Sequence, residues 1–492
     1  MRDMRQLTSL DHQFLALESR RQTGHVAGLA ILDTSGDATQ VTCRSVKQLV
    51  RSRLPALPPL RWRVVEVPLN LDYPYWVEDE EFDLDFHVRE LALAAPGNDE
   101  QLAEQVSRIV SRPLDRSRPL WELYVIEGVE GGRTAMLTKI HHALIDGMSG
   151  AEIMGLLLDL SPEGTALPPV DESKSRLGGP PGQLGMLARG ALGVPRYPLR
   201  VLRALPRALP NTRDAPAVFG TIPGADTVGR LASRVRGVVS GADTPSAKAL
   251  RAPRTTFSKR ISAHRRFAFG QLSLDEVKDV KNRYGVTVND LVVSICAGAV
   301  RRWLIEHDEL PDEPLVAQIP VSVRTDEERG TYGNRILLMR APLFTNVADP
   351  VRRLELTHEE MSVVKQRHKA LPASLLQDAN HFIPPAVFHR AAQLTFRVTS
   401  GSAGRPNWNL VISNVPGPQF PLYCAGARLE AQYPVSVITD GMGLNITVMS
   451  YCGHLDFGIV ADREQMPDVW NLIGWLGEAL DELKLQQPSP VA

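Results

Sequence analysis

Two adjacent histidines, His141 and His142, are the residues in this sequence best suited to chemistry. They open the run His-His-Ala-Leu-Ile-Asp-Gly, which ends in Asp146 and Gly147. An imidazole titrates near neutral pH, so it can remove a proton from a hydroxyl group and return it later in the same cycle. The carboxylate of Asp146 can fix the loop or a neighbouring cation. Gly147 leaves room for a substrate because it has no side chain. The run therefore indicates proton transfer at a substrate hydroxyl.

Two other interpretations of the histidine pair stay open on the residues alone. A pair of histidines at the end of a strand can be purely structural. A metal site would use His and Asp ligands, but no third ligand lies nearby in the sequence and the glutamate of an HExxH motif is absent. We therefore expect no metal.

The elements around the histidines place them where a strand gives way to a loop. Apolar runs at residues 121–126 and 134–140 predict two strands joined by a turn that contains Gly131 and Gly132. The second strand runs directly into the histidine pair, and residues 143–147 are expected to form a short loop. A rigid strand that ends in a loop can aim a side chain into a cleft. The helix expected next has an apolar face of Ile153, Leu156, Leu157 and Leu160.

Helix and strand patterns alternate through the rest of both halves. Asn98 and Gln101 resemble a capping box at the start of a helix that Pro113 stops. The remaining patterns predict helices at residues 46–54 and 286–303 and strands at 62–67, 315–323, 408–412, 444–450 and 455–459.

Composition limits the classes of function. The chain has 492 residues, which makes two domains the default expectation, and its formal net charge is −1. Nucleic-acid binding is not expected because no basic stripe runs along the chain. The chain has only four cysteines, and none forms a CxxC pair, which suggests an intracellular, reducing compartment. Cys296 lies in an apolar run typical of a buried helix. We find no signal peptide and no run of the roughly 18 apolar residues that a spanning helix needs.

The region from about residue 162 to 256 differs from the rest because proline and glycine accumulate in it. It is expected to be a long, partly helical connection between domains. No acidic residue occurs from Gln183 to Arg213, a stretch in which arginines alternate with leucines. This stretch is either a solvated linker that packs a few leucines on its neighbour or a docking segment for anionic lipid surfaces.

The complete run from His141 to Gly147 matches the HHxxxDG motif, so the chain resembles the chloramphenicol-acetyltransferase-like superfamily of CoA- and carrier-dependent acyltransferases. Other blocks are similar to those of bacterial wax ester synthase/diacylglycerol acyltransferases. Residues 113–122 resemble the block that contains that family's PLW motif, here Pro119-Leu120-Trp121, and Asn289-Asp290 resembles its ND motif. Further similar blocks lie at Leu10-Asp11, Phe14-Leu15, Glu18, residues 320–324, Gly333-Asn334, and residues 413–418, 443–447 and 456–458.

The resemblance covers nearly the whole chain apart from the linker. One departure lies at Gly24-His25-Val26-Ala27-Gly28, where the family often places a methionine before the His-Val pair and a glycine directly after it.

The resemblance implies an α/β (α+β) fold of two chloramphenicol-acetyltransferase-like domains around a central tunnel. We expect an N-terminal acyltransferase domain at residues 1–165, an interdomain linker at 166–256 and a C-terminal acyltransferase-like domain at 257–492.

The same resemblance implies roles for the site residues. His142 is expected to be the proton acceptor, with His141 in support and Asp146 holding the loop through an arginine such as Arg61, Arg63 or Arg324. The donor to the oxyanion would be Asn289 or a backbone N–H near Gly147. The residues expected to contact substrate are Pro119, Leu120, Trp121, Asp290, Ser413 and Asn414.

The function implied is an acyl-CoA-dependent O-acyltransferase that makes triacylglycerol from diacylglycerol, and wax esters from long-chain alcohols, with acyl-CoA as co-substrate and no bound cofactor. We expect a cytoplasmic protein at the inner face of the membrane or on lipid droplets. The alternatives are an acyltransferase for another lipid or polyketide acceptor and a non-catalytic lipid- or droplet-binding paralogue.

Overall fold

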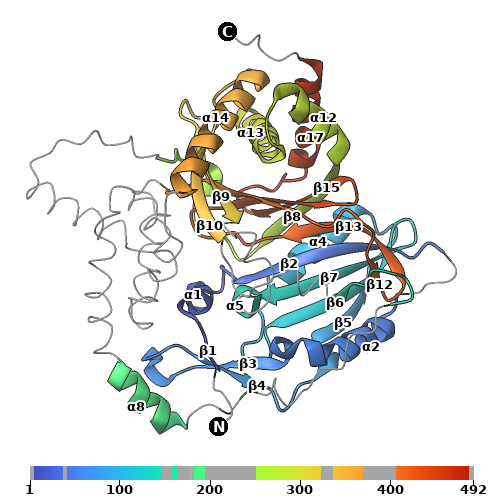
Figure 1. Ribbon diagram of the computed structural model, residues 1–492, viewed down its shortest axis with the longest axis vertical. Coiled ribbons are helices and arrows are strands. Elements are labelled where there is room, and N and C mark those ends of the chain that lie inside the picture. The colour runs from blue at the N-terminus through green and yellow to red at the C-terminus, as the bar shows by residue number, and fades with distance from the viewer. Residues whose placement is uncertain are drawn as a thin grey trace, which may run out of the picture.

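The computed structural model describes residues 5–36, 41–145, 157–164, 177, 179, 182–193, 251–322, 336–369 and 406–486. These residues form two mixed α/β halves, each built on a six-stranded sheet, with the second half above the first in Figure 1. None of the helices in the described ranges combines the length and the apolar character that crossing a membrane requires.

The first-half sheet has the strand order β12-β13-β2-β7-β6-β5. Its strands are β2 (His25–Asp33), β5 (Val88–Ala92), β6 (Trp121–Val129), β7 (Arg133–His141), β12 (Tyr423–Cys424) and β13 (Ala427–Val435). Side chains that alternate along β2 serve two different cores. Leu29 and Ile31 pack in the cluster that contains α4 (Asp99–Val110), whereas Ala30 and Leu32 pack in the cluster that contains α2 (Cys43–Arg53). Helices therefore cover both faces of this sheet.

The predicted capping box at Asn98 is confirmed. Gln101 N–H donates to Asn98 Oδ1 over 3.0 Å, and Asn98 N–H donates to Gln101 Oε1 over 3.0 Å. The two bonds satisfy N–H groups that have no partner inside the first turn of α4.

A small three-stranded sheet of order β1-β4-β3 lies below the first-half sheet in Figure 1. Its strands are β1 (Arg5–Gln6), β3 (Trp62–Val65) and β4 (Tyr75–Glu78). Helix α8 (Gln183–Gly193), which lies in the expected linker, packs Met186 against Val67 and Tyr75. The remaining first-half helices are α1 (Ser9–Leu17), α3 (Leu84–His87), α5 (His142–Ile145) and the 3₁₀ turns η1 (Leu54–Ala56), η2 (Pro58–Arg61) and η3 (Pro68–Asn70).

The second-half sheet has the order β10-β9-β11-β14-β15-β8. Its strands are β8 (Arg265–Ser273), β9 (Leu315–Ser322), β10 (Ile336–Leu343), β11 (Leu410–Val415), β14 (Leu444–Tyr451) and β15 (His454–Asp462). Its helices are α12 (Leu274–Tyr284), α13 (Val288–Glu306), α14 (Pro350–Lys369) and α17 (Asn471–Leu485), and the short turn η5 (Thr256–Ser258) opens the half.

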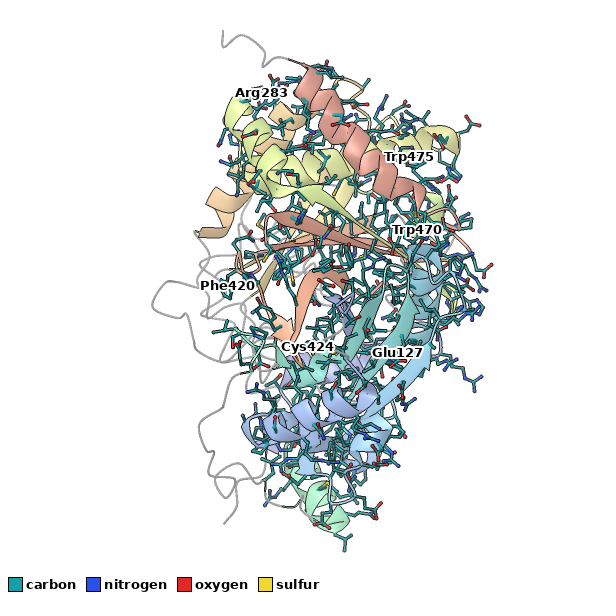
Figure 2. The ribbon with its side chains drawn as sticks, turned by 90° about the vertical axis from the view of Figure 1, so that its right-hand side faces the viewer. Glu127, Arg283, Phe420, Cys424, Trp470 and Trp475 are labelled. Atoms are coloured by element: carbon teal, nitrogen blue, oxygen red, sulfur yellow. The ribbon has the colours of Figure 1, made fainter. Side chains whose placement is uncertain are left out.

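These helices gather on one side of the second-half sheet, and Trp475 of α17 lies among them in Figure 2. Helix α13 is the centre of this core. Its Cys296 is fully buried, as predicted, and burial raises the pKa of the thiol. A thiol in such a setting packs as a small apolar group.

Strands β12 and β13 cross from the C-terminal part of the chain into the first-half sheet, where β13 pairs with β2 in antiparallel fashion. Cys424 of β12 accordingly lies at the level of the first half in Figure 2. Phe269 of β8 packs on Tyr433 of β13 with ring centroids 4.6 Å apart. The core at this junction therefore joins the two sheets.

The backbone at Asp159 anchors the same crossing segment. Asp159 and Tyr423 exchange two backbone hydrogen bonds of 2.7 and 2.9 Å. The buried carboxylate of Asp159 also lies 2.5 Å from the guanidinium of Arg53 on α2. The segment after the histidine motif is thus tied to both α2 and β12.

Two expectations for the region after His142 need correction. The backbone is helical from His142 to Ile145 instead of forming a loop that begins at Ala143. Leu160, expected on an apolar helix face, is 66% exposed, because the helix ends at Leu157 and the chain then pairs with β12. The arginines at 196, 200, 203, 207 and 213 lie outside the described residues.

Candidate active site

The histidine pair lies where β7 ends and α5 begins. His141 pairs laterally with His25 on β2, and its backbone N–H donates to the carbonyl of Leu120 over 2.9 Å. His142 N–H donates to the carbonyl of Gly24 over 2.9 Å. The segments at Leu120 and Gly24 therefore hold the end of β7 on both sides. The histidines lie at the end of a rigid strand, as expected.

The imidazole of His142 stacks on the phenyl ring of Phe14 from α1, with centroids 4.4 Å apart and planes 12° from parallel. The residue as a whole is partly exposed, but Nδ1 is enclosed and has no hydrogen-bond partner among the described residues. Burial, with a smaller contribution from His141, lowers the pKa of His142 to about 4. The ring is therefore neutral at physiological pH, as a general base must be.

His141 is fully buried, and its ring forms a hydrogen bond with the backbone. Its Nδ1 accepts a hydrogen bond of 3.1 Å from Ala143 N–H, so the ring hydrogen must be on Nε2 when the ring is neutral. That Nε2 lies 3.3 Å from Oε1 of Glu18. The supporting role expected for His141 stays a prediction, with which the hydrogen bond to Ala143 agrees.

Glu18 follows directly after α1 and contacts several parts of the site. Its Oε1 accepts a hydrogen bond of 2.8 Å from Gly24 N–H. Its Oε2 accepts two hydrogen bonds from Arg116, of 2.8 Å from Nη2 and 3.1 Å from Nε. Burial alone would raise the pKa of Glu18, but His141, Gly24 N–H and Arg116 together lower it to about 2. Glu18 is thus a carboxylate at any pH near neutrality.

Gly24 leaves the space that the His141 ring occupies. A Cβ at Gly24 would lie 2.6 Å from Nε2 of His141 and 3.0 Å from the carbonyl oxygen of Phe14. A side chain at position 24 would therefore collide with the His141 ring. This is the position at which the chain departs from the family pattern.

Sequence reasoning gave no role to Phe14, Glu18, Gly24 or Arg116. All four were available as signals, because Phe14 and Glu18 are in the opening block that resembles the family, Gly24 is in the visible departure, and Arg116 is in the block that contains the PLW motif. Arg116 lies three residues before Pro119, in the same chain segment as the PLW motif.

The residues of the PLW motif lie beside the histidines but are buried. Trp121 is 2% exposed and pairs with Ile140 on β7. Its indole N–H donates to the carbonyl of Leu60 over 2.7 Å, and its ring stacks on His87 with centroids 4.5 Å apart. Pro119 and Leu120 are buried as well. These contacts hold the strand next to β7 in place.

The ND motif lies in the second half, at the start of α13. Asp290 forms a capping box with Thr287, through bonds of 3.1 and 3.2 Å, and its Oδ2 lies 2.8 Å from Nδ1 of His358 on α14. Asp290 is buried, whereas Asn289 is partly exposed. Ser413 and Asn414 are partly exposed residues of β11. The structure thus places these four residues on second-half elements and the histidines on the first half.

Asp146 and Gly147 lie outside the described residues, as does Arg324. Two of the suggested partners of Asp146 have acidic neighbours on β4 and just beyond it. Arg61 lies 3.4 Å from Glu78, and Arg63 lies 3.8 Å from Asp79. Within the part of the chain that the structure describes, no three His, Cys, Asp or Glu side chains are grouped so that they could hold a metal ion.

Family comparisons cover most of the chain. The wax ester synthase/diacylglycerol acyltransferase catalytic domain matches residues 7–292, and the C-terminal domain of that family matches residues 332–484. A Mycobacterium tuberculosis protein named as a probable diacylglycerol O-acyltransferase, tgs2, is 35% identical over 96% of this chain and 97% of its own length. The O-acyltransferase WSD of Acinetobacter baylyi is 34% identical over 97% of this chain and 96% of its own length.

Solved structures show the same relationship. The wax ester synthase/diacylglycerol acyltransferase from Marinobacter aquaeolei VT8 superposes with a TM-score of 0.67 at 30% identity, over 98% of this chain and 99% of that one. The starter condensation domain of rhizomide synthetase superposes with a TM-score of 0.52 at 14% identity, over 99% and 96% of the two chains, which is a likeness of fold alone.

Proposed function

Because this chain belongs to the wax ester synthase/diacylglycerol acyltransferase family and is an acyltransferase, we propose that it transfers a long acyl chain from CoA to the hydroxyl of diacylglycerol. Long-chain alcohols are proposed as further acceptors, which would give wax esters. The names of the relatives support both acceptors, since they include diacylglycerol O-acyltransferases and a wax ester synthase.

The observation that carries the proposal is the protonation state and the position of the His142 imidazole. Its imidazole is neutral above pH 4 or so, because its pKa is lowered to about 4, and it lies at a strand end. Since Nδ1 is enclosed, Nε2 is the nitrogen that a substrate can meet. In the tautomer with hydrogen on Nδ1, the lone pair of Nε2 can accept a proton.

The proposed reaction needs one base and no covalent enzyme intermediate. As the alcohol oxygen attacks the thioester carbonyl carbon, Nε2 of His142 takes the hydroxyl proton. The carbonyl oxygen becomes an oxyanion, for which Asn289 or a backbone N–H near Gly147 is the proposed donor. Collapse of this intermediate breaks the C–S bond, and the CoA thiolate takes the proton from the imidazolium. The products are an ester and free CoA thiol, with His142 again neutral.

The test measures thiol release from palmitoyl-CoA with dioleoylglycerol or hexadecanol, for wild type and His142→Ala. The variant should retain the wild-type fold by circular dichroism and lose about two orders of magnitude or more in rate. Release that requires an acceptor and falls in the variant supports the proposal. A wild-type protein that is inert with both acceptors would point to another acceptor class, and sedimentation with liposomes without any thiol release would point to a lipid-binding protein.

The proposal includes the place of the reaction, because diacylglycerol and wax alcohols are found in membranes and droplets. We propose peripheral association with such a surface from the cytoplasm, through the arginine-rich stretch between Gln183 and Arg213. Liposome binding should then weaken with salt and with Arg→Glu changes at Arg200, Arg203 and Arg207. Binding that responds to neither would exclude this stretch as the docking segment.

A further inference from the structure

We infer that Glu18 is a positioning residue for His142: its carboxylate holds, through two separate arms, the backbone on both sides of the His142 Cα. The inference rests on the proposed function of His142 as the general base, and it assigns a task to a residue outside the HHxxxDG motif.

The first arm runs through Gly24. Oε1 of Glu18 accepts Gly24 N–H over 2.8 Å, and the carbonyl of Gly24 accepts His142 N–H over 2.9 Å. Glu18 therefore fixes the short segment that in turn fixes the N–H of the base. Because Gly24 is buried, water cannot readily replace the carboxylate in this arm.

The second arm runs through His141. The same Oε1 lies 3.3 Å from Nε2 of His141, a close contact without hydrogen-bond geometry, and Nδ1 of His141 accepts Ala143 N–H over 3.1 Å. The carboxylate favours the tautomer with hydrogen on Nε2, and only that neutral tautomer leaves Nδ1 able to accept. Ala143 follows His142 directly, so the two arms hold the backbone N–H groups on either side of the His142 Cα.

Glu18 is itself held firmly, which a positioning group must be. Its side chain is only 9% exposed, and Arg116 contacts Oε2 through two guanidinium nitrogens. Arg116 also donates to the carbonyl of Leu15 at the end of α1 over 2.5 Å.

The second half of the protein holds the segment between Glu18 and Gly24 from the other side. Arg265 at the start of β8 donates to the carbonyl of Arg21, and the N–H of Asp440 donates to Oε1 of Gln22 over 3.3 Å. The position of the base is thus linked through this segment to both halves of the fold.

The contacts indicate an effect on rate more than on binding. No hydrogen bond joins Glu18 to the His142 ring among the described residues; Glu18 accepts from Gly24 N–H and from Arg116, and it lies 3.3 Å from Nε2 of His141. Displacing a general base by about 1 Å can cost about 10²-fold in rate. We therefore expect Glu18→Ala to lower kcat by roughly 30- to 100-fold, with KM for palmitoyl-CoA changed less than about threefold.

Two variants separate positioning from general loss of stability. Glu18→Gln keeps an oxygen for both arms but loses the two bonds from Arg116, because its NH2 group replaces Oε2, and it should restore kcat to within about tenfold of wild type. Glu122→Ala is the matched control, because Glu122 is also a buried first-half glutamate, 3.3 Å from Lys139 and 2.8 Å from the Tyr124 hydroxyl. This control should unfold more easily and keep kcat within about threefold of wild type. Equal kcat losses in Glu18→Ala and Glu122→Ala would overturn the inference.

A second readout needs no substrate. In protein labelled with ¹⁵N-histidine, the ring signals of His141 and His142 are assigned by their loss in His141→Asn and His142→Ala. Wild type should show hydrogen on Nε2 of His141, and both ring signals should shift in Glu18→Ala but not in Glu122→Ala. Unchanged signals in Glu18→Ala would overturn the inference whatever the activity. Shifted signals in a protein inert towards both acceptors would uphold the positioning and reject the proposed reaction.

Discussion

The phenyl ring of Phe14 covers one face of the His142 imidazole, with centroids 4.4 Å apart and planes 12° from parallel. Phe14 belongs to α1, whose start is fixed by a capping box between Thr8 and Asp11. The N-terminal helix thus supplies the apolar surface that removes water from the proposed base. Removing water from an imidazole disfavours its charged form, which is the first cause of the lowered pKa of His142.

The pH dependence of the reaction should follow from this pKa. The base must be neutral, and the pKa of His142 is lowered to about 4, so activity is present above that pH and lost as pH falls through it. We expect kcat/KM with dioleoylglycerol to be flat from about pH 5.5 to 8 and to halve near pH 4. Circular dichroism at each pH controls for unfolding. A midpoint near the ordinary histidine value of about 6.5 would contradict the assignment.

Phe14→Ala should raise the acidic midpoint of kcat/KM. Water would then reach the face of the His142 ring that Phe14 covers in the wild type, and it would stabilise the imidazolium. We expect the midpoint to move towards about 6.5 and kcat at neutral pH to fall by about tenfold, since the ring loses one of its supports. Phe14→Leu is the control, as it keeps an apolar side chain over the ring and should keep a midpoint near that of wild type. The same upward shift in both variants would show that the aromatic stack itself is required.

Asp456→Asn should stabilise the protein above about pH 6. Burial raises the pKa of Asp456 to about 6, although Gln432 N–H and Gln271 Nε2 donate to it over 2.7 and 2.8 Å. A raised carboxyl pKa favours the fold at low pH, and this advantage is lost as pH rises through about 6. The gain from Asn, measured by denaturant unfolding, should grow by roughly 2 kcal/mol between about pH 4.5 and 8. A gain independent of pH would contradict this account.

Gly458→Ala should separate the two sheets at their junction. A Cβ on Gly458 of β15 would lie 1.7 Å from the carbonyl oxygen of Pro434 on β13, which is backbone and cannot turn away. We expect a loss of about 1–3 kcal/mol or more in the free energy of unfolding. Gly474→Ala is the matched control, because Gly474 lies in α17 with open space around its Cβ position. That change should stabilise by about 0.5–1 kcal/mol, and similar losses in both variants would argue against a tight junction.

Local patterns in the sequence predicted a part of the elements, with ends that differ from the observed ones by up to a few residues. The capping box of Asn98 and Gln101, the strands that became β6 and β7, and the buried helix around Cys296 all depend on residues close together in the chain. The helix expected at residues 286–303 is confirmed as α13, which runs from Val288 to Glu306. The HHxxxDG run, with the collinear blocks around it, was also enough to indicate the family that the comparisons then showed.

The surroundings of His142 could not be predicted in this way. Phe14 and Glu18 reach the histidines because β2 pairs with β7 and brings the end of α1 beside the end of β7. Strand pairing of this kind joins residues far apart in the chain, and no local period or spacing encodes which strand will be the neighbour.

The sequence by itself determined the chemical groups of this protein: a histidine pair in an acyltransferase motif, on an α/β chain of two similar halves. Only the tertiary structure decided which nitrogen of His141 carries the ring hydrogen, that Glu18 contacts the segments around the base, and that β13 crosses to join the halves. The physical reason is that residue types set what a group can do, whereas burial and neighbours set its pKa and orientation. Those neighbours come together only when the sheets form.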